Sequence, residues 1–448
     1  MNTPVCDFVE NYIKNGKARL HMPGHKGSSY LGCEMYDITE IDGADSLYEA
    51  KGIIRESELN AGALFGADTF YSTEGSSLCI RAMMYLISLY AKEKGRKNII
   101  LAGRNAHKAF LTGTALLDFD IQWLYGGENA SYLSCFVTPC ELEKVLSVLK
   151  EKPIAVYLTS PDYLGNTVDL EGISKVCRKH GVLLAVDNAH GSYLKFLPQS
   201  QHPIDLGADI CCDSAHKTLP VLTGGAYLHI SKSAPSFFKE QAKTAMELFG
   251  STSPSYLLLQ SLDKVNLYLS DGYSLKLASF VKKVELLKED MINRGYTLSG
   301  NEPLKITICA KLYGYSGTDF ANELRRRKVE CEFSDPDFTV LMLTPSMNEN
   351  DFILLKSALF DIPQKNTEFP EAPVVGRGKQ VISVREAVLS ESEYLPIEKC
   401  NGRILASLSV SCPPAIPVAV CGERIDEETL EIFKYYGIDC CRVVKENK

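Results

Sequence analysis

The sequence lacks the features that mark several common classes of protein. No apolar run approaches the length that spans a bilayer, and residues 1–27 contain no apolar stretch of the kind found in a secretory signal. Basic residues form no block, because 48 Lys and Arg are interspersed with 56 Asp and Glu for a net charge of −8. These absences argue against binding to nucleic acid or to a membrane, and they predict a cytoplasmic protein.

The 15 cysteines include no Cys-x-x-Cys pair, and their number is odd. Several of them, such as Cys177, Cys211 and Cys309, lie in apolar segments, where cysteine behaves as a small buried hydrophobic residue. We therefore expect reduced thiols, no disulfide framework and no metal site.

With 448 residues, 45% of them hydrophobic and 23% charged, the chain has the composition of a soluble globular protein with large cores. Short apolar runs alternate with helical patterns such as residues 170–180 (LEGISKVCRKH). This alternation predicts a parallel sheet covered by helices on both faces. The expected buried strands are residues 97–102 (KNIILA), 153–158 (PIAVYL), 182–186 (VLLAV) and 208–212 (ADICC).

Polar and titratable residues follow each of these four strands directly. They are residues 103–107 (GRNAH), 159–161 (TSP), 187–190 (DNAH) and 213–217 (DSAHK). The carboxyl ends of parallel strands meet at one edge of a sheet, and such sheets bind their ligands there. The ordinary polarity of loops explains one such cluster easily but four of them poorly, so the sequence predicts a site at this edge.

The C-terminal half contains further elements. Residues 255–294 are mostly helical, and a second α/β pattern covers residues 304–359. Residues 363–377 are polar and rich in proline, which is typical of a linker. Residues 382–448 follow as a compact tail.

Residues 72–77 (STEGSS) precede an apolar helix that we expect at residues 78–90. Gly75 permits close approach of the backbone, and the first amides of the helix with the serine hydroxyls would form an anion site. An ordinary helix cap is the alternative interpretation. The motif is not a P-loop, because no Gly-Lys-Ser/Thr follows it.

Asp187 ends a buried strand, so its carboxylate needs a cationic partner or hydrogen-bond donors. It is a candidate metal ligand, helix cap or counter-ion of a protonated heterocycle, and His107 and His190 are weak candidates for metal ligands. Lys217 favours the heterocycle. Pyridoxal phosphate requires an amine for its aldehyde, a carboxylate for its ring nitrogen and donors for its phosphate, and all three occur at predicted strand ends.

At these residues the sequence resembles the Orn/Lys/Arg decarboxylase family of pyridoxal-phosphate enzymes, over nearly the whole chain and on its shorter, biosynthetic-type branch. The most specific match is the cofactor-lysine motif at residues 214–223 (SAHKTLPVLT). The other matching segments are residues 21–27 (HMPGHKG), 52–56 (GIIRE), 65–68 (FGAD), 251–256 (STSPSY), 402–404 (GRI), 412–414 (CPP) and 422–423 (GE).

The resemblance implies an α/β protein with the fold-type-I, aspartate-aminotransferase-like fold of pyridoxal-phosphate-dependent transferases. This fold has a mainly parallel central sheet, a smaller α/β domain and, in this family, a C-terminal α+β domain. The implied divisions are an N-terminal arm at residues 1–30, a large cofactor-binding domain at 31–255, a small α/β domain with connecting helices at 256–365, and a C-terminal decarboxylase-type domain at 376–448.

The resemblance also implies roles for single residues. Lys217 would form the Schiff base, Asp187 would partner the ring nitrogen, and His216 would donate a proton. His107 would stack on one face of the ring and Ala189 would pack against the other. The residues implied at the phosphate are Gly75, Ser76, Ser77 and Ser214, with Thr252 in a segment that reaches the neighbouring subunit's cofactor.

Three positions depart from the family pattern. Glu74 stands where asparagine usually precedes the glycine of the phosphate loop. Asn188 stands where an acidic residue usually follows the aspartate, and Gly224 where glutamine usually follows the Leu-Thr pair. A negative charge at Glu74 is unfavourable beside a phosphate unless it points away or is paired.

The implied reaction is decarboxylation of arginine, lysine or ornithine to agmatine, cadaverine or putrescine, a step of polyamine biosynthesis, in a homodimer or a dimer of dimers with shared sites. Two alternatives stay open. An aminotransferase would need an arginine to clamp the α-carboxylate, and Arg385 and Arg403 are candidates, whereas residues 325–327 (RRR) are typical of a solvated helix face. A catalytically silent homologue that binds the cofactor would be consistent with the three departures.

Overall fold

The structure is a computed structural model that describes residues 1–127, 131–408 and 415–446. The chain divides into two compact units. The first unit comprises residues 1–97, 154–156 and 170–278, and the second unit comprises residues 98–153, 157–169 and 279–448. The domain boundaries that the resemblance implies stay predictions.

A seven-stranded sheet has the order β1-β7-β6-β5-β4-β2-β3. β5 pairs in parallel with β6, and β2 with β3, whereas β7 runs antiparallel to both β1 and β6. The sheet is therefore mainly parallel, which confirms the predicted fold class. Its strands are β1 Asp68–Ser72, β2 Ile99–Gly103, β3 Asp120–Leu124, β4 Ala155–Thr159, β5 Leu183–Asp187, β6 Ile210–Asp213 and β7 Ala226–Ile230.

The four strands predicted from apolar runs are confirmed as β2, β4, β5 and β6, each within two residues of its expected ends. The other three strands escape this criterion because polar residues interrupt them. β3 (DIQWL) lies at one edge of the sheet and is only partly buried. β7 (AYLHI) is buried at every position, yet it contains His229.

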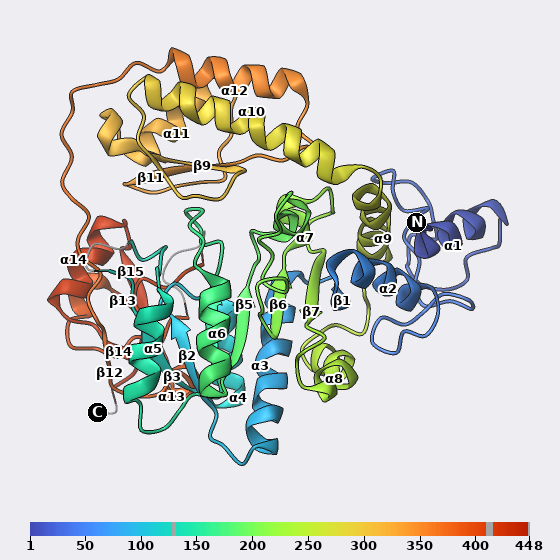
Figure 1. The fold of residues 1–448 in the computed structure, drawn as a ribbon, viewed down its shortest axis with the longest axis horizontal. Coiled ribbons are helices and arrows are strands. Elements are labelled where there is room, and N and C mark those ends of the chain that lie inside the picture. The colour runs from blue at the N-terminus through green and yellow to red at the C-terminus, as the bar shows by residue number, and fades with distance from the viewer. Residues whose placement is uncertain (128–130, 409–414, 447–448) are drawn as a thin grey trace. The chain divides into compact units, whose positions relative to one another are not determined.

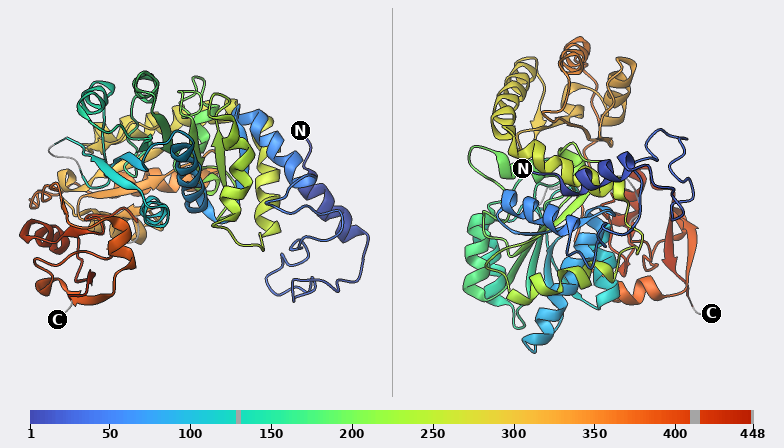
Figure 2. Two further views of the ribbon diagram at one scale, coloured as in Figure 1. Left: turned by 90° about the horizontal axis from the view of Figure 1, so that it is seen from below. Right: turned by 90° about the vertical axis from the view of Figure 1, so that its right-hand side faces the viewer.

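The predicted helix after residues 72–77 is confirmed as α3 (Gly75–Glu93) in the first unit. Its apolar face makes it a core helix, packed against β7 and against α8 (Ser236–Glu247). Figure 2 shows the segment between α1 and α2 as a long irregular loop. The other helices of this unit are α1 Pro4–Lys14, α2 Ile53–Phe65, α6 Leu170–His180, the 3-10 helix η1 Ser192–Phe196, α7 Ala215–Thr218 and α9 Tyr256–Ser270.

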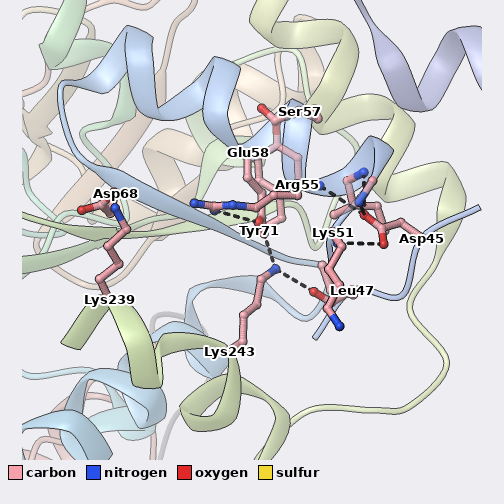
Figure 3. A network of polar contacts seen from close by, with 12 residues as sticks. Asp45, Leu47, Lys51, Arg55, Ser57, Glu58, Asp68, Tyr71, Lys239 and Lys243 are labelled. Atoms are coloured by element: carbon pink, nitrogen blue, oxygen red, sulfur yellow. Dashed lines mark hydrogen bonds and ion pairs between the residues drawn. The ribbon is translucent and has the colours of Figure 1, made fainter. Parts of the chain in front are cut away.

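A buried polar network fixes α2 against β1 in the first unit (Figure 3). The fully buried Glu58 accepts hydrogen bonds from the Tyr71 amide at 3.0 Å and from Lys243 Nζ. The carboxylate of Asp45 accepts the amide of Gly52 at 2.8 Å at the start of α2. Because β1 leads into the turn before α3, this network also positions the N-terminus of α3.

The second unit contains an antiparallel sheet of order β10-β11-β9-β8, and Figure 1 shows α10, α11 and α12 beside β9 and β11. This confirms the predicted second α/β pattern. The elements are α10 Tyr273–Asn293, which begins in the first unit, β8 Leu298–Ser299, β9 Lys305–Cys309, the 3-10 helix η2 Ala310–Tyr313, α11 Gly317–Arg326, β10 Phe333–Ser334, β11 Phe338–Met342 and α12 Glu349–Asp361. The unit also includes α4 Lys108–Leu117 and α5 Pro139–Val148.

Residues 363–378 form neither helix nor strand, as expected for a linker, and the compact tail follows. Its core is built on buried apolar side chains such as Leu405, Phe433 and Val443. The Cys412-Pro413-Pro414 motif lies outside the described residues. In the part of the chain that is described, no helix has both the length and the apolar character needed to cross a membrane. The tail comprises β12 Lys379–Gln380, α13 Val384–Leu389, β13 Ser392–Pro396, the 3-10 helix η3 Ile397–Lys399, β14 Glu423–Arg424, α14 Glu427–Tyr435 and β15 Cys440–Val444.

Candidate active site

Three segments of the first unit emerge at one edge of the large sheet. β5 and β6 are parallel neighbours that end at Asp187 and Asp213, with Asp187 paired to Cys212. β1 ends at Ser72, which pairs with Ala226 at the start of the antiparallel β7. The turn before α3, the loop after β5 and the segment between β6 and β7 therefore lie at the same edge, and they carry most of the predicted site residues.

The start of α3 has the properties of an anion site. Gly75 adopts φ +71°, a Cβ built on it would meet no atom within 4 Å, and its amide donates to the carbonyl of Gly224 at 2.7 Å. The first turn of α3 contains no acidic side chain, and no side chain caps its amides. Ser214 Oγ donates to Ser76 Oγ at 2.7 Å, so a hydroxyl from each segment lies beside these amides, next to Ser77.

The carboxylate of Glu74 is engaged by its own contacts. Its carboxylate accepts the amide of Ser251 at 2.6 Å. Burial lowers the pKa of Arg81 on α3, and the charge of Glu74 partly offsets that effect. The departure at Glu74 is therefore compatible with an anion at the start of α3, because the carboxylate is engaged by Ser251 and balanced by Arg81.

Asp187 has only 2% of its surface exposed. Its Oδ1 accepts the amide of Ala189 at 3.1 Å and lies 3.7 Å from the Cys212 thiol. A carboxylate buried at the carboxyl end of a strand can stabilise a cation such as a protonated ring nitrogen. The burial of Ala189 beside it is consistent with a surface on which a flat ring packs.

Lys217 lies on the short helix α7, and its Nζ is 3.1 Å from Nε2 of His190. This contact identifies His190 as a site residue that the sequence suggested only as a weak metal ligand. His216 Nδ1 lies 3.0 Å from the carbonyl of Gly225, the same carbonyl that accepts the backbone amide of His216. The ring of His190 thus contacts the lysine amine, and the ring of His216 contacts the carbonyl of Gly225.

Asp213 forms a cluster that the sequence analysis missed. Its Oδ1 accepts Asn188 Nδ2 at 2.7 Å, and its Oδ2 lies 3.1 Å from His202 Nε2 and 3.4 Å from His229 Nε2. All four side chains are completely buried. Burial alone would raise the pKa of Asp213, but His202 and His229 bring it well below the ordinary value, so the carboxyl is ionised. The signal available in the sequence was one polar residue in each of two otherwise apolar strands, Asp213 in β6 and His229 in β7.

Asn188, one of the three departures from the family pattern, belongs to this cluster. Its side-chain amide donates to the carboxylate of Asp213 on the neighbouring strand β6. An amide at position 188 is therefore compatible with the ionised Asp213 beside it.

His202, Cys211 and Asp213 also bring three potential metal-ligating atoms within 4.8 Å of one another. The hydrogen bonds favour a different role for them. His202 Nδ1 accepts the amide of Ile204 at 3.4 Å, so in the neutral ring the proton is on Nε2, where it is donated to Asp213. A metal ligand would need that nitrogen unprotonated, so this cluster is a hydrogen-bonded one.

Two further predicted site residues have other described surroundings. His107 belongs to the second unit, where it caps α4 by accepting the amide of Ala109 at 3.1 Å on Nδ1. Thr252 is exposed in the segment that follows α8. Their roles toward a ring and toward a neighbouring subunit stay predictions.

These features define a class of protein: an α/β enzyme with a mainly parallel sheet, whose strand ends bring together a helix N-terminus, a buried aspartate and a lysine. Comparison with known families agrees. Residues 3–352 match the Orn/Lys/Arg decarboxylase major domain, and residues 378–440 match the Orn/Lys/Arg decarboxylase C-terminal domain. The chain therefore belongs to the Orn/Lys/Arg decarboxylase family and is an amino-acid decarboxylase that acts on a basic amino acid.

Similar proteins carry related names. The chain is 29% identical to an arginine decarboxylase of Bacillus subtilis, over 96% of this chain and 93% of that protein. It is 23% identical to the constitutive lysine decarboxylase of Escherichia coli, over 77% of this chain and 52% of that protein. The solved structure of the E. coli enzyme matches with a TM-score of 0.75 at 17% identity, covering 99% of this chain and 82% of that one. Lysine decarboxylase A from Pseudomonas aeruginosa matches with a TM-score of 0.78 at 17% identity, covering 97% and 76%.

Proposed function

We propose that this chain decarboxylates its basic amino acid with pyridoxal phosphate held at the sheet edge of the first unit. Lys217 would hold the cofactor through its amine, Asp187 would bind its ring nitrogen, and Ala189 would lie against the ring. The start of α3 with Ser76, Ser77 and Ser214 would bind the phosphate. The observation that supports the proposal is that these residues lie on segments emerging at one sheet edge, with Ser214 bonded to Ser76, Ala189 bonded to Asp187, and the half-buried Lys217 bonded to His190.

When bound, pyridoxal phosphate supplies an aldehyde that reacts with amines and a protonated ring that accepts the electron pair left by departing carbon dioxide. The residues of the chain do the rest. Asp187 keeps a positive charge on the ring nitrogen favourable in a buried place. Lys217 or His216 delivers a proton to the substrate carbon after carbon dioxide has left.

The arginines that transamination would require are engaged elsewhere in the second unit. Arg385 Nη1 donates to the carbonyls of Ala115 and Leu116 at 2.9 and 3.1 Å. Arg403 Nη2 donates to Glu393 at 2.8 Å. These contacts favour decarboxylation, in which no clamp on the α-carboxylate is needed.

Arginine is the substrate to test first, because relatives named arginine decarboxylase align over 96% of the chain. The products would be agmatine from arginine, cadaverine from lysine or putrescine from ornithine, which are polyamines or their precursors. The holoprotein should be incubated with each amino acid while amine and carbon dioxide are measured. Release of both in equal amounts without a keto acid supports the proposal, and amine formation from none of the three would contradict it.

Lys217→Ala tests the cofactor. We expect this variant to lose the visible absorbance of bound pyridoxal phosphate and at least about a thousandfold in activity, because the amine both holds the aldehyde and moves protons. The readout is the absorption spectrum after gel filtration. A covalent chromophore retained without Lys217 would contradict the assignment of this lysine.

We further propose a cytoplasmic homodimer or dimer of dimers. Cysteines in the described residues form no disulfide, as expected in a reducing compartment. Ser251 and Thr252 are exposed, as a segment that completes a neighbouring subunit's site would be before assembly. Sedimentation of the active protein as a monomer would contradict the dimer.

A further inference from the structure

The contact between Lys217 and His190 addresses a problem of protonation. The ordinary pKa of a lysine amine is about 10.4, so fewer than about one in a thousand such amines is neutral at pH 7. An amine attacks an aldehyde carbon only with its lone pair, so one proton must leave before or during the attack. The Nζ of Lys217 lies 3.1 Å from His190 Nε2, within reach of direct proton transfer.

The position of His190 is set by a tight turn. The amide of Gly191 donates to the carbonyl of Asn188 at 2.8 Å, which closes the turn around residues 189 and 190. A Cβ at position 191 would lie 2.0 Å from Asn188 Oδ1 and 2.8 Å from Leu194 Cδ1. Only glycine fits there, and so the turn can hold His190 at a fixed place, with 5% of its surface exposed.

Asn188 anchors this turn to the neighbouring strand through two hydrogen bonds. Its backbone amide donates to the carbonyl of Cys212 at 2.9 Å, and its side-chain amide donates to Asp213. Asp213 is itself held from the other side by His202 and His229. A continuous set of buried contacts therefore runs from the ionised Asp213 through Asn188 to the turn that presents His190 to Lys217.

We propose that His190 is a further catalytic residue, the base that takes a proton from the Lys217 amine, and that Asn188 and Asp213 are its positioning residues. This inference rests on the proposed function, since it concerns the step in which Lys217 binds or releases an aldehyde. No residue outside the first unit is needed for it.

The proton transfer balances within the pair. The bond from Nζ to one hydrogen breaks, its electron pair stays on Nζ as the nucleophile, and a bond from Nε2 to the same hydrogen forms. The positive charge moves from the amine to the imidazole, and the hydrogen bond between the two nitrogens persists with its direction reversed. When Lys217 is released again, the proton returns along the same path.

The titratable groups around this turn come from five elements. β5 has Asp187, β6 has Cys211, Cys212 and Asp213, α7 has His216 and Lys217, η1 has Tyr193 and Lys195, and β7, which contacts β6 and α7, has Tyr227 and His229. Lys195 is paired with Asp205 at 2.7 Å. Asp213 is ionised, so its negative charge favours a positive charge on the imidazole when His190 holds the proton. The arrangement therefore supports the transfer in the required direction.

The experiment measures the rate at which full-length cofactor-free protein takes up pyridoxal phosphate, followed by visible absorbance in a stopped-flow instrument from pH 6 to pH 9. In His190→Gln the amide oxygen keeps a hydrogen bond to Lys217 but cannot take its proton. We expect uptake at pH 7 to slow about a hundredfold and the rise of the rate with pH to move to higher pH by at least about one unit. His180→Gln, at the end of α6, is the matched control and should leave rate and pH profile unchanged.

Asn188→Ala separates the base from its positioning. The imidazole is still present in this variant, so we expect uptake to slow by about tenfold without a shift of the pH profile. If His190→Gln takes up cofactor at the wild-type rate with the wild-type pH profile, His190 is only a hydrogen-bond partner and the proposal is wrong.

A second variant covers the case in which His190→Gln does not fold. His190→Ala leaves space for an imidazole, and added imidazole should speed cofactor uptake in proportion to its unprotonated fraction. No acceleration in a folded protein would overturn the proposal. Failure of the proposed function looks different, since Lys217→Ala and the wild type would then show the same spectrum with the cofactor.

Discussion

Two buried aspartates, one in each unit, are surrounded by different kinds of donor. Asp213 ends β6 in the first unit, and its neighbours are two imidazoles and one amide. Asp162 follows β4 in the second unit, and its neighbours are a hydroxyl and amides: Ser134 Oγ at 2.6 Å, Asn166 Nδ2 at 2.8 Å and the amide of Leu164 at 2.9 Å. Both side chains are at least 97% buried, since 0% and 3% of their surfaces are exposed.

The pKa values of the two carboxyls move in opposite directions. At Asp162 burial raises the pKa, and the hydrogen bonds from Ser134 and Asn166 together with the charge of Lys305 only reduce that effect. At Asp213 burial acts in the same sense, but the imidazoles of His202 and His229 outweigh it and the pKa falls. Burial therefore does not decide the charge of a carboxyl by itself. Two imidazoles beside the Asp213 carboxylate outweigh burial, whereas neutral donors and the charge of Lys305 do not outweigh it at Asp162.

The difference fits the surroundings of each cluster. Asp213 is joined through Asn188 to the loop that carries Asp187 and His190, so its charge bears on the proposed site. Asp162 organises a loop in the second unit, where Lys305 Nζ donates to the carbonyls of Asp162 and Tyr163 at 3.1 and 3.2 Å. We infer a structural role for the Asp162 cluster and a functional one for the Asp213 cluster.

Removal of the two carboxylates should separate these roles most strongly. Asp213→Ala leaves two buried imidazoles and the Asn188 amide without their acceptor, and we expect a loss of about 3 kcal/mol in the free energy of unfolding. We also expect slower cofactor uptake, because Asn188 loses its anchor. Urea unfolding measures the first and stopped-flow absorbance the second.

Asp162→Ala is the matched variant. It should cost about 2 kcal/mol, because a hydroxyl and amides lose their acceptor and no ionised carboxylate is removed from a pair of imidazoles. Cofactor uptake should not change. The comparison fails if Asp162→Ala slows uptake as much as Asp213→Ala does.

The sequence predicted the parts of the fold that depend on apolar patterning. The core strands β2, β4, β5 and β6 are nearly continuous apolar runs, and α3 is an apolar helix with a clear start. β7 was missed because His229 interrupts it, and the reason for that histidine lies in Asp213, a partner on the neighbouring strand. Pairing of this kind depends on register between strands, which local patterning does not contain.

Only part of the candidate site was predicted, because the remaining contacts join residues that are distant in the sequence. The motif around Lys217, Asp187 and the start of α3 follows from residues at strand ends. His190 appeared as a loop histidine, and its contact with Lys217 arises only when the turn closed by Gly191 is placed beside α7. The departure at Asn188 likewise became interpretable once Asp213 was seen to receive its amide.

An exchange of donors should move Asp213 toward the behaviour of Asp162. His202→Asn replaces one imidazole by an amide, and we expect a loss of about 1–2 kcal/mol in the free energy of unfolding. The stabilisation by Asp213 is present above the pKa of an unfolded aspartate, about 3.9, and is lost as the pH falls through its lowered folded pKa. With one imidazole gone that folded pKa rises toward the unfolded value, so the loss should be smaller and should be complete at a higher pH.

Unfolding of wild type and His202→Asn should be compared from about pH 2 to pH 7, which covers the window below the unfolded pKa. Ser134→Ala is the control, because it removes one neutral donor from Asp162. It should leave unchanged the stability that Asp213 contributes at acid pH. Identical acid profiles for the wild type and His202→Asn would show that His229 alone keeps Asp213 ionised.

The smallest expected effect is the pH dependence of Asp162→Asn. The new asparagine side chain keeps one acceptor oxygen for the backbone amides of Leu164 and Asn166. Its NH₂ group, however, faces the NH₂ group of Asn166. We therefore expect the free energy of unfolding to fall by about 1 kcal/mol. Because the folded pKa of Asp162 is raised, the native state holds the Asp162 proton more tightly than the unfolded chain does. The stability that this group contributes to the wild type therefore declines as the pH rises from about 3.9 through the folded pKa. Asparagine does not titrate. The stability difference between wild type and Asp162→Asn should therefore shrink as the pH rises. The corresponding difference for Asp213→Asn should grow as the pH rises through the window below about 3.9. Chemical denaturation of both pairs from about pH 2 to pH 7 measures the two slopes, and slopes of the same sign would mean that the two clusters hold their buried carboxyls alike in this protein.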